Sequence, residues 1–209
     1  MNLDVAGILL KSKAVVLSPN KPFLYSSGLK GPIYCDNRLL ISYVKEREDI
    51  TDCFVKMIMD TGCSFDLIAA IATAAIPWGA WIAQSFKIPL IYIRSARKDH
   101  GRAKEIEGEY QKISEAIIIE DTINQGTGSL HGVNVLRENK IKIKQIFAIV
   151  NYGFDHVFSR FCKQEVNINS LCSLQNIIEA GIKENIINQD DKKTIMHWYE
   201  NPEKWTGSN

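Results

Sequence analysis

The 209-residue chain lacks the compositional signs of several large classes of protein. Its 25 Lys and Arg residues nearly balance its 24 Asp and Glu residues, and the net charge of +1 argues against a surface specialised for nucleic acid or an acidic membrane. No window reaches the roughly 18 consecutive apolar residues that a membrane span needs, and the N-terminus has no signal-peptide pattern. We therefore expect a cytoplasmic protein.

The cysteines form no recognisable pattern of disulfide or metal-binding pairs. They are five in number, which is odd, and they include no CxxC pair. This usage is expected of a reduced cytosolic protein, and we interpret the thiols as buried and inert. No internal repeat or low-complexity tract is found. With 45% apolar residues, the chain can supply the core of one α/β domain with a small appendage.

Hydrophobic periodicity predicts alternating helices and strands along most of the chain. The elements expected after residue 40 are a helix at 43–61, a strand at 66–71, a helix at 77–86, strands at 89–94 and 116–121, a helix at 127–139 and a strand at 143–150. A helix, a short strand and two helices follow. Before residue 40, a helix at 2–13 and one or two small strands are expected to form a hood. This alternation predicts a parallel sheet covered on both faces, with right-handed crossovers.

The most informative segment is IIIEDTINQGTGS, at residues 117–129. Its apolar run has the length and β-branched content of a central parallel strand, which would carry Glu120 and Asp121 to its end. Ionised carboxylates there can accept hydrogen bonds from vicinal hydroxyls. A turn through Gly126 and Gly128 would expose backbone N–H groups at a helix N-terminus, where a phosphate is favoured. A plain structural junction between strand and helix is the alternative.

A second polar segment, between Arg94 and Lys104, carries five basic residues against Asp99 alone, a local charge of +4. His100 and Gly101 lie in its middle. Such a loop is suited to closing over diphosphate, and loops of this kind usually stay mobile until the ligand arrives. A solvated connection is the alternative.

Several segments carry a resemblance to a known family. Glu-Asp followed by a Gly/Thr turn looks like the phosphoribosyl diphosphate (PRPP) motif of type I phosphoribosyltransferases. Four further segments resemble orotate phosphoribosyltransferases in the form common in Gram-positive bacteria: FLYSSGLKGPIYCDNR at 23–38, AIATAAIPWGAWIA at 70–83, YIRSARKDHGRAKEIEG at 92–108 and IVNYGF at 149–154. The similarity spans nearly the whole chain. It implies the type I phosphoribosyltransferase fold, an α/β fold with a parallel central sheet flanked by helices, as a single domain of residues 1–209 in which residues 1–40 contribute most of the hood.

The resemblance also implies roles for individual residues. The ribose hydroxyls of PRPP would bind Glu120 and Asp121, and Asp121 would be catalytic. The other PRPP-binding residues that it implies from this motif are Thr122, Ile123, Asn124, Gln125, Gly126, Thr127 and Gly128, of which Asn124 to Gly128 would cradle the 5′-phosphate. In the family, the residues matching Arg94, Lys98 and His100 reach PRPP from the neighbouring subunit of a dimer, so Lys98 and His100 would complete each catalytic site in trans.

The resemblance assigns the diphosphate loop to Ala72, Thr73 and Ala74, although packing at a helix start would explain these small residues equally well. Orotate would contact Asn124 and Tyr34. Tyr34 lies in the hood region with Ser27, Gly28, Lys30, Asp36 and Arg38. Core packing is the alternative for any one of these residues.

The chain departs from the family pattern at two places. The family usually has small hydroxyl residues where this chain has Asn124 and Gln125, which leaves open their effect on base choice and phosphate binding. No arginine follows the strand at 143–150, where enterobacterial relatives place one near the orotate carboxylate. We discount that absence because NYGF looks like the Gram-positive form.

The leading hypothesis is therefore a pentosyltransferase that makes orotidine 5′-monophosphate from orotate and PRPP in pyrimidine synthesis. Mg²⁺ would be brought mainly by PRPP, so no dedicated ligand motif is expected. Two alternatives are a phosphoribosyltransferase for another base, motivated by Asn124 and Gln125, and a noncatalytic PRPP-binding regulator. The near-neutral charge argues against an attached DNA-binding segment.

Overall fold

The computed structural model of the protein describes residues 3–25, 27–94 and 105–207. These residues divide into two compact units. Residues 1–46 and 172–209 make up the first unit, and residues 47–171 make up the second. The prediction of one domain, with residues 1–40 supplying most of the hood, stays a prediction.

The first unit combines both ends of the chain. Its elements are α1 (Val5–Lys11), β1 (Val15–Leu17), β2 (Phe23–Leu24), β3 (Lys30–Gly31), β4 (Ile33–Cys35), the 3-10 helix η1 (Asn37–Ser42), α6 (Leu174–Lys183) and α7 (Gln189–Glu200). Strand β1 pairs antiparallel with β4, and β2 pairs antiparallel with β3. The expectation of one or two strands before residue 40 is wrong, because the described part of this segment contains four. Strands of two or three residues are too short to show an alternating pattern.

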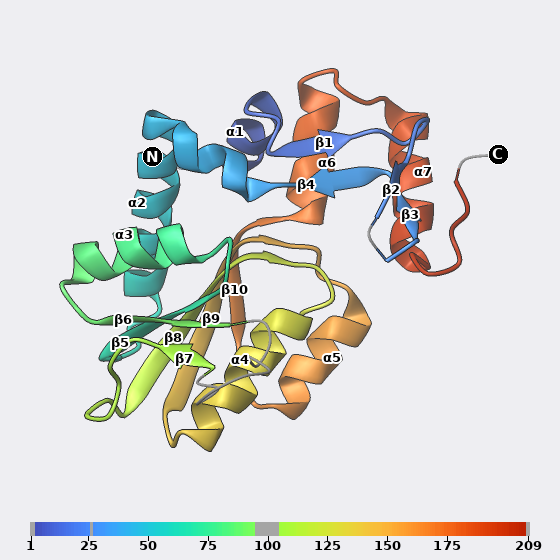
Figure 1. Ribbon diagram of the computed structural model, residues 1–209. Helices are drawn as coiled ribbons and strands as arrows, with labels where there is room; N and C mark the ends of the chain where they lie inside the picture. The colour runs from blue at the N-terminus through green and yellow to red at the C-terminus, as the bar shows by residue number, and fades with distance from the viewer. Residues whose placement is uncertain (1–2, 26, 95–104, 208–209) are drawn as a thin grey trace. The chain divides into compact units, whose positions relative to one another are not determined.

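The second unit is built around one sheet. Its helices are α2 (Val44–Asp60), α3 (Ile76–Phe86), α4 (Thr127–Glu138) and α5 (Asp155–Lys163). Its strands are β5 (Leu67–Ile71), β6 (Leu90–Ile93), β7 (Ile106–Glu107), β8 (Glu115–Ile123), β9 (Lys142–Asn151) and β10 (Ile168–Ser173). Within the described residues these six strands lie in the order β10-β9-β8-β5-β6-β7 (Figure 1). Elements α2 and β10 cross the boundary between the units.

Parallel pairing runs through the centre of this sheet, where β5 lies between β6 and β8, and β8 pairs with β9. At the edge, β7 pairs antiparallel with β6. Every residue of β5 is buried, as are Ala116 to Glu120 of β8. Such continuous burial is typical of parallel strands covered on both faces. The predicted α/β fold with a parallel central sheet is confirmed, and β7 adds one antiparallel strand at the edge.

Helices α3 and α4 cover opposite faces of the sheet, and both use glycine to approach it closely. A Cβ built on Gly79 of α3 would lie 2.8 Å from the Cβ of Ala70. A Cβ built on Gly132 of α4 would lie 2.5 Å from Ile71 Cδ1. Because successive residues of a strand point to opposite faces, Ala70 and Ile71 mark the two faces that these helices cover.

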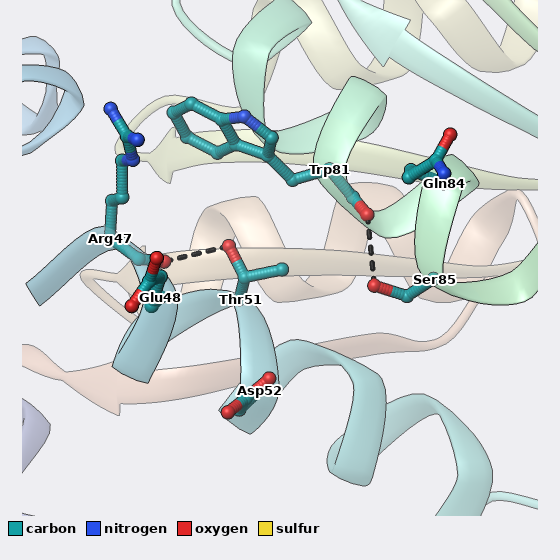
Figure 2. Close-up of a pocket in the computed structure, with 7 residues that line it drawn as sticks. All are labelled: Arg47, Glu48, Thr51, Asp52, Trp81, Gln84 and Ser85. Atoms are coloured by element: carbon teal, nitrogen blue, oxygen red, sulfur yellow. Dashed lines mark hydrogen bonds between the residues drawn. The ribbon is translucent and has the colours of Figure 1, made fainter. Parts of the chain in front are cut away.

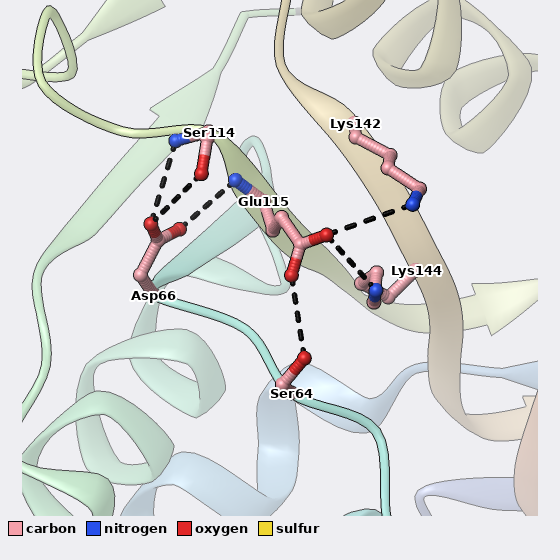
Figure 3. Close-up of polar contacts among 6 residues, drawn as sticks. All are labelled: Ser64, Asp66, Ser114, Glu115, Lys142 and Lys144. Atoms are coloured by element: carbon pink, nitrogen blue, oxygen red, sulfur yellow. Dashed lines mark hydrogen bonds and ion pairs between the residues drawn. The ribbon is translucent and has the colours of Figure 1, made fainter.

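The amino ends of the strands are joined by a group of charged and hydroxyl side chains (Figure 3). Asp66, before β5, accepts hydrogen bonds from the backbone N–H groups of Ser114 and Glu115. The Glu115 carboxylate, in turn, is 3.0 Å from Lys144 Nζ and 3.6 Å from Lys142 Nζ. These contacts tie β8 to its neighbours at the end of the sheet away from the predicted site.

The helices and strands expected after residue 40 are confirmed, each with ends that agree within two residues. Strand β7 was missed, because two residues carry no periodicity. The interpretation of the thiols as buried is confirmed for Cys172, but Cys162 is exposed. Within the described residues, no helix is both long and apolar enough to cross a membrane. The cytoplasmic location stays a prediction.

Candidate active site

Glu120 and Asp121 lie near the carboxyl end of β8, which continues past them to Ile123. Glu120 shares the sheet face of Ile118 and points toward α4, where the buried Ser129 Oγ donates to Glu120 Oε2 at 3.0 Å. The backbone N–H of Asp121 donates to Glu120 Oε1 at 3.1 Å. Asp121 is half-buried, and Thr122 Oγ1 donates to its Oδ2 at 3.5 Å. Glu120 is therefore held back by α4, whereas Asp121 is the more accessible acid.

Both acids of this pair resist ionisation. Burial, together with the charge of Asp121, raises the pKa of Glu120 to about 8, although the hydrogen bond from Ser129 opposes both effects. Burial also raises the pKa of Asp121. Two adjacent carboxyl groups that interact this strongly titrate as a pair. Ionisation of the pair is therefore unfavourable, and a ligand that donates hydrogen bonds to carboxylates would favour it.

The turn after these acids, Asn124–Gly128, leads directly into α4. Gly126 has φ 68°, a left-handed conformation that side chains rarely adopt. A Cβ at this position would also lie 2.6 Å from Phe161 Cε2 of α5. Within the described residues, no side chain caps the N-terminus of α4. Thr127 and Gly128 are exposed, so this end of the helix presents backbone N–H groups to a ligand.

Asn124 and Gln125, the two residues of the 124–128 turn that depart from the family pattern, have side chains in different environments. The Asn124 Oδ1 atom is buried and has no hydrogen-bond partner within the described residues. Gln125 is exposed, and its Oε1 is 2.8 Å from His156 Nε2. Arg160 Nη1 donates to the Gln125 backbone oxygen at 2.9 Å. Gln125 is thus engaged by α5, and Asn124 retains an acceptor that a ligand could use.

The predicted diphosphate loop follows β5, the neighbour of β8. Ala72, Thr73 and Ala74 separate the strand from α3, and Thr73 is exposed. The peptide bond between Ala72 and Thr73 is cis. A Cβ built on Gly128 would lie 3.4 Å from Ile71 Cγ2 and 3.5 Å from Glu120 Oε2. The start of α4 therefore lies beside the end of β5. The structure thus brings the 72–74 loop, the two acids and the 124–128 turn together at the carboxyl ends of the parallel strands.

Arg94 follows the carboxyl end of β6, at the same end of the sheet. Its Nη1 is 3.3 Å from Glu107 Oε1, and its backbone N–H donates to the Glu105 oxygen at 2.9 Å. His131 of α4 contacts the Arg94 backbone oxygen through Nε2 at 3.1 Å. These contacts fix the base of the charged segment. Lys98 and His100 lie outside the described residues.

Tyr34 belongs to the first unit, on β4. Its side chain is exposed, and its ring centroid lies 5.5 Å from that of Phe23. Gly28 has φ 83° in the turn between β2 and β3, and Asp36 accepts from Arg38 Nε at 2.6 Å. Tyr34 is therefore not a core residue, which removes the alternative explanation for it.

Comparisons with known proteins identify the family of the chain. A scan against models of protein families found no match. The chain is 37% identical over 202 residues to the orotate phosphoribosyltransferase of Coxiella burnetii, which covers 97% of each chain. It is 38% identical over 205 residues to that of Bacillus caldolyticus, which covers 98% of this chain and 99% of the relative. The chain belongs to the orotate phosphoribosyltransferase family.

A solved structure supports the same family at the level of the fold. The orotate phosphoribosyltransferase of Aeropyrum pernix matches with a TM-score of 0.76 and 25% identity, over 88% of this chain and 99% of that chain. The PRPP motif seen in the sequence thus lies on the fold of the family to which the chain belongs.

A surface pocket of about 400 Å³ lies elsewhere in the second unit, between α2 and α3 (Figure 2). Its lining residues are Arg47, Glu48, Thr51, Asp52, Trp81, Gln84 and Ser85. Arg47 lies over the Trp81 ring, with Cζ 5.4 Å from the ring centroid. None of the residues that the family resemblance implicates lines this pocket. The candidate active site therefore remains at the carboxyl ends of β5 and β8.

Sequence reasoning missed several residues that contact the predicted site. Ser129 holds Glu120, while His156 and Arg160 hold Gln125. Ser129 follows the glycine turn immediately, where a hydroxyl can face back toward the strand. His156 and Arg160 are four residues apart in a helix that was predicted, so they share one face. This spacing was the available signal, but it did not show what the face would touch.

Proposed function

We propose that this member of the orotate phosphoribosyltransferase family transfers the 5-phosphoribosyl group from PRPP to orotate, which gives orotidine 5′-monophosphate and diphosphate in pyrimidine synthesis. One observation carries the assignment of the site. Two acids with raised pKa values lie near the carboxyl end of a central parallel strand, beside a helix N-terminus that no side chain caps within the described residues. This arrangement suits a ligand that carries vicinal hydroxyls next to a phosphate.

In this proposal Glu120 and Asp121 accept hydrogen bonds from the ribose 2′ and 3′ hydroxyls. Their negative charge stabilises the positive charge that develops on the ribose ring as the bond from C1 to diphosphate loosens. Asp121 makes the larger contribution because it is more accessible, while Ser129 holds Glu120 in place. Neither acid acts as a nucleophile.

The 124–128 turn binds the 5′-phosphate through backbone N–H groups, and Thr127 adds a hydroxyl donor. Thr122 and Ile123 connect this turn to the acids. Asn124 reaches orotate through its side chain, since its Oδ1 is an unpaired acceptor within the described residues. The family resemblance also assigns Tyr34 to the base.

Diphosphate is held by the loop of Ala72, Thr73 and Ala74 together with Arg94, Lys98 and His100. Arg94 would exchange its contact with Glu107 for a bidentate contact with phosphate. We place Lys98 and His100 in the site of a neighbouring subunit, where His100 donates a hydrogen bond or a proton to the leaving diphosphate.

The donor set fits a Mg²⁺ ion that arrives with PRPP. Within the described residues no cluster of three or more His, Cys, Asp or Glu side chains could hold a metal by itself. Mg²⁺ commonly binds through phosphates, water and one or two carboxylates, and Glu120 and Asp121 supply two carboxyl groups. When bound, the ion neutralises charge on the phosphate oxygens.

A steady-state assay with orotate, PRPP and Mg²⁺ tests the function. We expect orotate consumption and formation of orotidine 5′-monophosphate, both strictly dependent on PRPP. Consumption of another base without formation of orotidylate would instead make the protein a transferase for that base. Tight PRPP binding with no turnover of any base would make it a noncatalytic regulator.

Mixing two inactive variants tests the shared site. A hybrid dimer of one Lys98→Ala subunit and one Asp121→Asn subunit contains one intact site if Lys98 acts in trans. We expect recovery of activity when the two variants are unfolded and refolded together. Each variant refolded alone is the control, and no recovery in the mixture would contradict the shared site.

A further inference from the structure

Helix α5 contacts the 124–128 turn through one face, and the apolar part of this face forms a floor under Gly126. Val157 and Phe161 are each 1% exposed. A Cβ built on Gly126 would lie 2.6 Å from Phe161 Cε2 and 3.1 Å from Val157 Cγ1. Glycine is therefore required here both for its left-handed conformation and for the closeness of α5. The turn has no room to move toward the helix.

The polar part of the same face holds Gln125 at two points. His156 Nε2 is 2.8 Å from the Gln125 side-chain oxygen, and Arg160 Nη1 donates to the Gln125 backbone oxygen at 2.9 Å. The His156 ring is stacked on Phe154, with centroids 5.5 Å apart and planes at 20°. Since Phe154 is buried, this stacking limits the rotation of the His156 ring.

The bond from Arg160 has a consequence for the next backbone N–H group. The peptide bond between Gln125 and Gly126 is trans, so its C=O and N–H point in opposite directions. A carbonyl oxygen held toward α5 therefore directs the Gly126 N–H away from α5. The reversed peptide would present a carbonyl oxygen to a phosphate, which repels it. A guanidinium on this carbonyl disfavours that reversal, because hydrogen bonds to charged groups are the stronger ones.

We propose that Arg160 is a positioning residue for the 5′-phosphate: it fixes the Gln125–Gly126 peptide with its N–H toward the ligand, and His156 supports it through the Gln125 side chain. This inference rests on the proposed function, because it takes the 124–128 turn to be the phosphate site. It also gives the unusual length of Gln125 a purpose, since a shorter side chain would not reach His156.

The test compares two ligands that differ in the group concerned. Ribose 5-phosphate carries the 5′-phosphate, whereas Mg²⁺-diphosphate occupies the loop after β5. We expect Arg160→Met to weaken ribose 5-phosphate binding by about fivefold to tenfold, and to change Mg²⁺-diphosphate binding by less than about twofold. Isothermal titration calorimetry on the full chain measures both. Arg160→Lys keeps a charged donor and should recover part of the loss, and His156→Ala should weaken ribose 5-phosphate binding less than Arg160→Met does.

Arg137→Met is the matched control, because Arg137 also donates to a backbone oxygen, that of Gln164, from an exposed position in the same unit. It should lower thermal stability as much as Arg160→Met does while leaving both affinities unchanged. Equal loss of both ligands in Arg160→Met, or no loss of either, would overturn the positioning role. Wild-type protein that fails to bind ribose 5-phosphate would overturn the phosphate site itself, and the role of Arg160 with it.

Discussion

Strand β8 begins with one carboxylate, Glu115, and carries two, Glu120 and Asp121, near its other end. At the beginning, a hydrogen bond from Lys144 lowers the pKa of Glu115, and Lys142 and Ser64 assist (Figure 3). Near the end, burial raises the pKa values of both Glu120 and Asp121, and the charge of Asp121 adds to the effect on Glu120. One strand thus holds a carboxylate that the fold stabilises and a pair whose ionisation the fold opposes.

The opposite pKa shifts indicate different roles for the two ends of β8. Glu115 has its cationic partners within the protein, so its charge serves to join strands. Glu120 has a hydroxyl and an N–H as partners but no cationic partner within the described residues, and it lies beside a second acid. Unfavourable charge of this kind is expected where a ligand completes the site, because groups with perturbed pKa values gather at functional sites. Four predictions test this comparison.

The largest effect is expected for Asp121→Asn. The substitution removes a negative charge beside the reacting sugar, so kcat/KM should fall by about 100-fold to 1,000-fold, whereas the melting temperature should stay the same or rise. Steady-state kinetics with PRPP and orotate and a thermal melt measure the two quantities. Glu115→Gln is the control, and it should retain full activity. Unchanged turnover by Asp121→Asn would show that this pair does not serve the sugar.

The next effect concerns stability and its dependence on pH. The folded-state pKa of Glu120 is raised from 4.5 to about 8. Its contribution to the free energy of unfolding is therefore highest at low pH, where Glu120 is protonated in both states, and it decreases as pH rises through this range. Glu120→Gln removes that loss. The variant should exceed the wild type in free energy of unfolding by about 1–3 kcal/mol at pH 8 and by less at pH 5. Urea unfolding at both pH values measures this. A difference that does not grow with pH would contradict the raised pKa.

A smaller effect is expected for Ser129→Ala, which deletes the hydroxyl that donates to Glu120. The buried acid loses one hydrogen bond, so the free energy of unfolding should fall by about 1 kcal/mol and the KM for PRPP should rise severalfold. Ser129→Thr keeps a donor and is the matched comparison. Equal behaviour of the Ala variant and the wild type in both assays would remove Ser129 from the site.

The smallest effect belongs to Glu115→Gln, and its pH dependence should have the opposite sign. The folded-state pKa of Glu115 is lowered, so its contribution is present above the unfolded value of 4.5 and is lost as pH falls through the folded value. The melting temperature should decrease by about 1–3 °C at pH 7 and hardly change at acid pH. A larger loss at acid pH than at pH 7 would refute the ion pairs as its cause.

Much of the fold was predictable because buried helix and strand positions carry apolar residues at regular spacings in the sequence. The continuous apolar run of β5 and the spacing within α2 and α4 located those elements closely. The short strands β2, β3 and β7 escaped, since pairs of residues carry no period. Cys162 was misjudged because it follows the buried Phe161 by one position, which turns it about 100° around the helix toward solvent.

The candidate site was predictable where chemistry is local in the sequence. Glu120, Asp121 and the 124–128 turn are consecutive, so one strand and one turn bring them together. The roles of Gln125 and Ser129 depend on which helices pack nearby, and no pattern within the turn records that. His156 and Arg160 come from a helix that follows another strand, so their contact with Gln125 exists only in three dimensions.

A crystal structure of the protein with bound PRPP would show directly which residues hold the sugar and its phosphate. We expect the ribose hydroxyls within hydrogen-bond distance of the Glu120 and Asp121 carboxyl groups, and the 5′-phosphate on the backbone N–H groups of the 124–128 turn. PRPP bound at another place, or a sugar that leaves both acids without contact, would contradict this expectation.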